Sequence, residues 1–235
     1  MRHTAIVILD MGTRAFVWLG GGLFAGALAI CGWSYVVVWG RSRSFAGWEP
    51  LAIDAALITI FALHHSLFAR ERVKAGLARA VPPALLRSVY VWIASLLLIL
   101  VCVLWQPIGA TLYAVTGGAA IVCVSVQLIG VFITARSVAR IDPLELAGIH
   151  PANHGQGLQV TGPYRWVRHP LYLGWWLMTF GAAHMTGDRL AFAAITALYL
   201  AIAIPWEERS LQRSFGDEYA CYKRAVQWRM IPFIY

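Results

Sequence analysis

The sequence predicts an all-α protein, a polytopic membrane helix bundle of about six spans. Of its 235 residues, 60% are hydrophobic and 13% are charged, and the mean hydropathy is +0.65. Soluble domains are about 45–50% apolar and about 25% charged. Two long runs, 15–40 and 89–135, contain no Asp, Glu, Lys or Arg. The basic residues are also distributed unevenly between the two sides of the expected membrane.

Each span follows from a run of apolar residues, since about 20 of them cross a bilayer. The run 89–135 is long enough to cross twice, and Gln106-Pro107-Ile108-Gly109 is the expected turn because Pro and Gly interrupt helices. The last two runs are separated only by Gly187-Asp188-Arg189, which predicts a tight helical hairpin. The expected spans are 15–39, 51–69, 88–105, 112–135, 170–186 and 190–206.

The formal charge of +8 does not indicate nucleic-acid binding, because the basic residues follow a membrane topology. If the N-terminus is cytoplasmic, 16 of the 19 Lys and Arg residues lie on the cytoplasmic side, and only Arg41, Arg43 and Arg189 lie outside. We therefore expect a multi-pass protein of the bacterial inner membrane with both termini in the cytoplasm. Membrane lipids are its expected partners, and the sequence does not predict its oligomeric state.

The chain divides into two parts that we expect to form one structural unit. Residues 1–140 supply the N-terminal transmembrane helices, and residues 141–235 supply a turn-rich loop, the helical hairpin and a cytoplasmic tail.

In the first span, Gly22 and Gly26 form a small-xxx-small pair that predicts close approach of another helix. We expect no metal site, because His150 and His154, four residues apart in a turn-rich loop, could bind a metal only if two more ligands converged on them.

A cluster of basic residues precedes the hairpin in the stretch GPYRWVRHPLYLG, residues 162–174. Proline favours the first position of a helix and disfavours helix at the residue before it, so this span is expected to begin at Pro170 with His169 near its cap. The start of a helix attracts anions, and Arg165 and Arg168 add positive charge. These arginines equally suit an anchor among lipid headgroups.

The last span ends at two adjacent carboxylates, Glu207 and Glu208. Because the outer turn of the hairpin is short, these carboxylates are expected to lie beside Arg168 and His169. A charge held partly inside a membrane bundle is costly and suggests function. A cleft with one cationic and one anionic wall suits a zwitterionic ligand such as an amino acid, a lipid headgroup or a sulfonium cofactor.

Two segments of the C-terminal part of the chain resemble a known family. VTGPYRWVRHPLYLGWW and PWEERSLQRSFGDEYACYKRAVQWRMIP are similar to the C-terminal signature of the isoprenylcysteine carboxyl methyltransferase family, over roughly residues 155–235. Its members are integral membrane enzymes that use S-adenosyl-L-methionine. The segment HHSLFARERVKAGLARAVPPALLRSVYVWIASLLL resembles the bacterial branch that includes methanethiol S-methyltransferases and NnrU-like proteins.

The resemblance implies a cofactor site and a catalytic pair. Glu207 takes the position of the family's essential glutamate, and with His169 it is the expected catalytic pair. Arg168 and Glu208 join the site on the reasoning from charge given above. The expected cofactor-binding residues are Gln156, Gly157, Leu158, Gln159, Tyr164, Arg168, His169, Pro170, Leu171, Tyr172, Glu207 and Glu208.

The methyl acceptor is less defined than the donor. The eukaryotic carboxyl methyltransferases have an arginine four residues before the essential glutamate, where this chain has Ala203. We therefore expect a thiol or another small or lipophilic acceptor rather than a prenylcysteine carboxylate. The alternatives are a prenylcysteine carboxyl O-methyltransferase and a non-catalytic membrane protein, such as an NnrU-like assembly factor or a transporter.

Overall fold

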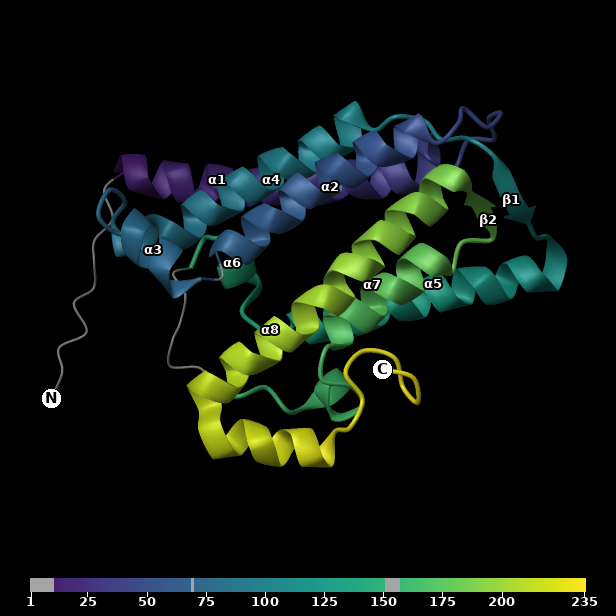
Figure 1. Ribbon diagram of the computed structural model, residues 1–235. Helices are drawn as coiled ribbons and strands as arrows, with labels where there is room; N and C mark the ends of the chain where they lie inside the picture. The colour runs from purple at the N-terminus through teal and green to yellow at the C-terminus, as the bar shows by residue number, and fades with distance from the viewer. Residues whose placement is uncertain (1–10, 69, 151–156) are drawn as a thin grey trace, which may run out of the picture.

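The computed structural model describes residues 11–68, 70–150 and 157–235, which form a bundle of long helices with two short strands (Figure 1). Within these residues, five helices are long and apolar enough to cross a membrane: α1 (Met11–Trp33, continued by a π-helical turn Ser34–Val38), α2 (Glu49–Phe68), α4 (Leu86–Leu104), α5 (Gly117–Val138) and α8 (Gly187–Ala225). The shorter elements are α3 (Glu71–Leu77), α6 (Pro143–Leu146), α7 (Pro170–Phe180), β1 (Thr111–Ala114) and β2 (His184–Thr186). The predicted all-α, polytopic class is confirmed.

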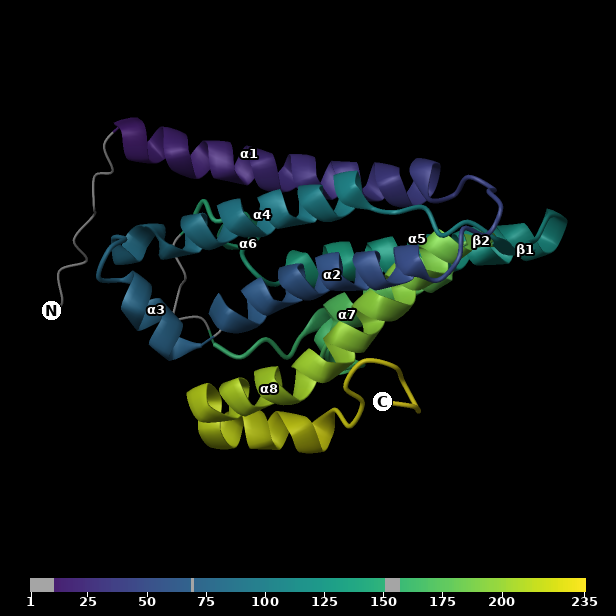
Figure 2. The same ribbon diagram turned by 45° about the horizontal axis from the view of Figure 1, so that its top comes forward.

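The long helices pack in an order that puts α8 in the middle of the bundle. α1 contacts α4, α4 contacts α2, α2 contacts α8, α8 contacts α7, and α7 contacts α5 (Figures 1 and 2). One buried cluster, around Trp39, Trp105 and Phe192, joins the N-terminal helices to α8. Another, around Ile133, Leu173 and Ile204, joins α5, α7 and α8. Side chains from both halves of the sequence therefore share one core.

The segment 170–186 is helical only in its first part. α7 has 11 residues and rises about 16.5 Å, roughly half of the hydrocarbon thickness of about 30 Å. The chain then continues extended into β2, which pairs antiparallel with β1. The predicted helix over 112–135 likewise starts only at Gly117, because 111–114 form β1. Backbone polar groups in lipid need partners, and this strand pairing supplies them where the helix stops.

The strand pair lies at one end of the bundle, opposite the end where α7 begins. There the predicted turn at residues 106–109 is held by Asp188, whose carboxylate accepts hydrogen bonds from Trp105 Nε1, Ile108 N and Gly109 N at 2.9–3.0 Å. Asp188 belongs to the short hairpin turn, so this contact ties the turn to the end of α4. From this turn, α8 runs back toward the end of the bundle at which α7 begins.

Close helix packing occurs at glycines other than the predicted pair. A Cβ on Gly22 or Gly26 would meet no atom within 4 Å, so the prediction of close approach there was wrong. Instead α5 and α7 meet at Gly130 and Gly174. A Cβ on Gly130 would lie 2.7 Å from Gly174 O and 2.8 Å from Met178 N. α5 and α7 are thus in direct backbone contact at these two glycines.

We predict that Gly130→Ala destabilises the protein while Gly26→Ala does not. Overpacking of a tight contact costs about 1–3 kcal/mol, and here the obstructing atoms are backbone. Alanine at position 26 has open space and a better helix propensity than glycine. Thermal unfolding of the two purified variants in detergent measures the difference. Equal midpoints would contradict the packing described for α5 and α7.

α8 reverses direction at Gly216, which has φ of 52° and ψ of −125°. Positive φ at this position favours glycine, since a side chain there would be strained. The reversal divides α8 into a first arm, 187–215, and a second arm, 217–225, which folds back and packs against the end of the first arm (Figure 2). The tail, 226–235, then returns to the bundle beside α7 (Figure 1). The second arm therefore packs against the end of the first arm, and the tail packs against α7 and the first arm.

Candidate active site

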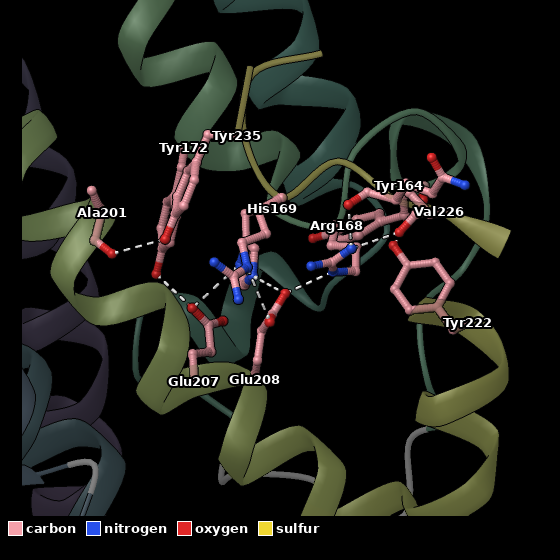
Figure 3. Close-up of polar contacts among 12 residues, drawn as sticks. Tyr164, Arg168, His169, Tyr172, Ala201, Glu207, Glu208, Tyr222, Val226 and Tyr235 are labelled. Atoms are coloured by element: carbon pink, nitrogen blue, oxygen red, sulfur yellow. Dashed lines mark hydrogen bonds and ion pairs between the residues drawn. The ribbon is translucent and has the colours of Figure 1, made fainter. Parts of the chain in front are cut away.

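The entry of α7 is fastened to the tail by backbone hydrogen bonds. α7 begins at Pro170 with His169 as its N-cap, as predicted. Arg168 N donates to Trp228 O at 2.9 Å, and His169 N donates to Arg229 O at 2.8 Å. The backbone around His169 is therefore fixed before its side chain makes any contact. Figure 3 shows this region, with the side chains of α7 and of the first arm of α8 pointing toward one another.

The predicted meeting of the basic entry and the acidic pair is confirmed by a buried ion pair. Arg168 Nε lies 2.6 Å from Glu208 Oε1, and both side chains are only 6% exposed (Figure 3). Arg168 Nη1 also donates to Val226 O and Gln227 O, each at 2.7 Å. Arg168 therefore joins α7, the first arm and the tail, and its Nε and Nη1 are used within the chain.

Glu207 is the more accessible of the two carboxylates, with 44% of its side chain exposed. Its Oε2 accepts a hydrogen bond of 2.9 Å from the Tyr172 hydroxyl and lies 3.5 Å from His169 Nδ1. His169 is 4% exposed, stacks on the Tyr172 ring, and has Nε2 3.6 Å from Glu208 Oε1. One imidazole thus lies between two carboxylates, one buried and one open.

This position changes the pKa of His169. Burial alone lowers it, but the negative charges of Glu207 and Glu208, 3.5 Å and 3.6 Å from its two ring nitrogens, raise it more, so the net pKa lies above the usual value. Because the folded-state pKa is raised, the stabilisation is complete below about pH 6.5 and is lost as the pH rises through the raised pKa. The imidazolium therefore persists to a higher pH here than in an exposed histidine.

We predict that the stability advantage of the native protein over His169→Gln shrinks as the pH rises. The advantage should be largest near about pH 6, where the imidazolium is present in both the folded and unfolded chains, and smallest near about pH 9. Thermal or denaturant unfolding of both proteins across this range measures it. A difference that stays constant with pH would contradict the ion pairs of His169.

Behind this group lies a cavity of about 320 Å³, which we call the site cavity. Its volume is within the roughly 300–1,000 Å³ of small-molecule sites. Among the predicted cofactor-binding residues, those that line it are Gly157, Leu158, Gln159, Tyr164, Arg168, His169, Pro170, Leu171, Tyr172 and Glu207. Glu208 does not line it, and Gln156 lies outside the described residues.

The sequence reasoning missed the walls that α8 supplies. Leu211 and Phe215 of the first arm and Tyr219 and Tyr222 of the second arm complete the site cavity, together with Ile141. Tyr222 Oη donates to Tyr164 O at 2.7 Å, which ties the second arm to the loop before α7. The signal was present in FGDEYACY, where glycine makes the reversal and both tyrosines fall on one face of the second arm.

The lining combines three kinds of surface. Aromatic rings and aliphatic side chains form most of the wall, and the His169–Glu207 pair forms a charged edge. Such a cavity accommodates a flat, partly apolar group at one end and a cationic or zwitterionic group at the other. Among the described residues, no group of three or more His, Cys, Asp or Glu side chains is arranged to hold a metal ion.

Comparison with known proteins gives both a family profile and individual relatives. The profile of the phospholipid methyltransferase family matches residues 118–218. The chain is 37% identical over 194 residues to methanethiol S-methyltransferase 1 of Bradyrhizobium diazoefficiens, covering 79% of this chain and 68% of that protein. It is 37% identical over 193 residues to the methanethiol S-methyltransferase of Crocosphaera subtropica, covering 78% and 75%.

A more distant relative is not named as a methyltransferase. The chain is 29% identical over 180 residues to Nurim of Homo sapiens, covering 69% of this chain and 68% of that protein. No solved structure matches the chain.

Proposed function

Since the chain belongs to the membrane methyltransferase family that includes the methanethiol S-methyltransferases, we propose that it transfers a methyl group from S-adenosyl-L-methionine to a small thiol. The site cavity is where we assign the reaction. The observation that carries the proposal is the His169–Glu207–Tyr172 group at its edge, because it supplies both a proton acceptor and a negative charge beside an aromatic cavity.

The residues of the site cavity fit this cofactor. His169 Nε2 and Tyr219 Oη are buried without a hydrogen-bond partner among the described residues, and both side chains line the cavity. Buried polar atoms are usually satisfied, so these two are available to a ligand. The rings of Tyr164, Tyr172 and Tyr222 offer stacking surfaces for the adenine, and the carboxylate of Glu207 suits a cationic group.

When bound, S-adenosyl-L-methionine supplies an electrophilic methyl group on a sulfonium. A thiol reacts as its thiolate, and an unperturbed thiol has a pKa near about 8.5. We assign the removal of the thiol proton to Nε2 of the neutral imidazole of His169, since a general base works best when its pKa is near the operating pH and the pKa of His169 is raised from about 6.5. Glu207 and Glu208 stabilise the imidazolium that results, and Tyr172 holds Glu207 in place.

The acceptor is tested with purified protein, labelled S-adenosyl-L-methionine and a panel of small thiols, prenylcysteines and phospholipids. We expect label on the small thiols. Label confined to prenylcysteine or phospholipid would overturn the thiol assignment. Cofactor binding is measured separately in the native protein and in His169→Ala, where we expect weaker binding. Failure of the native protein to bind the cofactor would overturn the enzymatic proposal and favour a non-catalytic role.

We further propose that the end of the bundle containing the site cavity faces the cytoplasm, because most Lys and Arg residues flank it. Cys221, on the second arm, is exposed, whereas Cys31 and Cys102 are buried. We predict that a membrane-impermeant maleimide labels Cys221 in inverted membrane vesicles and not in intact cells, with Cys221→Ser as the control. Labelling in intact cells alone would reverse the orientation.

A further inference from the structure

A second cavity, of about 500 Å³, lies between the two arms of α8 and the tail, and we call it the basic cavity. It shares no lining residue with the site cavity. Its lining residues are Pro205, Glu208, Arg209, Gln212, Arg213, Lys223 and Arg229. Four cationic side chains thus surround it against one carboxylate, and that carboxylate is already paired with Arg168 at 2.6 Å.

Three of the four cations of the basic cavity lack an anionic partner within the described residues, and the fourth, Arg229, has its Nε 3.4 Å from Glu208 Oε2. Within residues 11–68, 70–150 and 157–235, no carboxylate lies at ion-pair distance from Arg209, Arg213 or Lys223. Arg213 Nε donates to Arg209 O at 3.2 Å, and Lys223 lies over the Tyr219 ring at 5.9 Å. These contacts leave the positive charges without compensation.

Three separate segments bring these charges together. Arg209 and Arg213 lie on the first arm, Lys223 lies on the second arm, and Arg229 lies on the tail. The first two segments are joined through the reversal at Gly216 and pack together near it, where Leu211 and Phe215 contact the cluster of Tyr219 and Tyr222. Like charges at short range repel one another. An anion in the basic cavity would therefore hold together segments that repel each other without it.

The chemistry of the cavity favours a phosphate group. Arginine forks bind phosphate through paired N–H donors, and lysine adds a point charge. The cavity also lies beside Trp206, which is 66% exposed and has the Arg209 guanidinium 4.9 Å from its ring centroid. Exposed tryptophan next to a membrane-spanning helix is typical of the membrane–water boundary, where lipid headgroups lie.

We propose that the basic cavity binds the phosphate of an anionic phospholipid headgroup, which bridges the two arms of α8 and the tail. Clusters of Lys and Arg beside a transmembrane helix attract anionic lipids. The inference does not depend on the proposed function, since none of Arg209, Arg213 and Lys223 lines the site cavity. Because the same two arms also carry walls of the site cavity, the lipid would stabilise that cavity indirectly.

The experiment measures binding of soluble short-chain lipids to the full-length protein in neutral detergent by calorimetry. Dihexanoyl phosphatidylglycerol, dihexanoyl phosphatidylcholine and inorganic phosphate are titrated separately. The test variant is Arg213→Gln/Lys223→Gln. The matched control, Arg72→Gln/Arg79→Gln, removes two exposed charges from the segment after α2, outside the basic cavity. If the double variant does not purify, Lys223→Gln alone replaces it.

We expect phosphatidylglycerol to bind the native protein and the control variant equally, and the test variant about tenfold or more weakly. It should also raise the unfolding midpoint of the native protein and of the control, but not of the test variant. Equal binding by the test and control variants would overturn the site. Inorganic phosphate binding as tightly as phosphatidylglycerol, or phosphatidylcholine binding equally well, would overturn the assignment to an anionic lipid.

Discussion

Replacing Glu207 with Gln is expected to lower kcat/KM for thiol methylation by about 100- to 10,000-fold, the usual range for loss of general acid–base assistance. The change removes the negative charge that lies 3.5 Å from His169 Nδ1 while keeping the shape of the side chain. Without that charge the imidazolium formed by proton transfer is less stable. Steady-state kinetics with a small thiol measure the effect.

The matched control is Glu218→Gln, which removes an exposed carboxylate from the second arm. It does not line the site cavity and should leave kcat/KM unchanged. Glu218→Gln should unfold at the native temperature, and Glu207→Gln only slightly below it, because Glu207 is 44% exposed and His169 keeps its ion pair with Glu208. Native activity in Glu207→Gln would remove Glu207 from the reaction and leave His169 paired only with Glu208.

The sequence predicted the parts of the fold that depend on local composition. Apolar runs located the long helices, and the short turn at Gly187-Asp188-Arg189 correctly brought His169 beside Glu208. What it could not predict depends on contacts between distant segments. Residues 184–186 form a strand because 111–114 lie opposite them, and a hydrophobic run does not reveal such a partner.

In the candidate site, too, local sequence predicted some features, and contacts between distant segments determined the others. The motif around His169 predicted most of the lining of the site cavity, but not the walls contributed by Leu211, Phe215, Tyr219 and Tyr222. Those walls exist because the chain reverses at Gly216, and only the folded arms bring the motif FGDEYACY back to the entry of α7. The proposed roles of Glu207 and His169 stay predictions until their variants are measured.

Arg168 is the residue whose expected role changes most once its contacts are known. Charge alone placed Arg168 on the cationic wall of a cleft for a zwitterionic ligand. The folded chain places Nε on Glu208 and Nη1 on two carbonyl oxygens of the tail, with the side chain 6% exposed. Arg168 lines the site cavity, but those contacts exist without any ligand. We therefore expect Arg168 to contribute first of all to the stability of the folded protein.

We predict that Arg168→Gln lowers the free energy of unfolding of the cofactor-free protein by about 3–5 kcal/mol, the cost of breaking a buried ion pair from one side. The loss has two sources. Glu208 would keep a buried charge without its 2.6 Å partner, and the tail would lose two hydrogen bonds of 2.7 Å. Thermal and denaturant unfolding of the purified variant in detergent measures it.

Arg165→Gln is the control, since it removes the same charge from an exposed position three residues earlier and should change stability by no more than about 0.5 kcal/mol. The double variant Arg168→Met/Glu208→Leu should recover part of the loss, because an apolar pair leaves no unpaired charge between those positions. If Arg168→Gln instead unfolds like Arg165→Gln and loses only cofactor affinity, then Arg168 acts as a ligand of the cofactor and the tail is held by its backbone contacts alone.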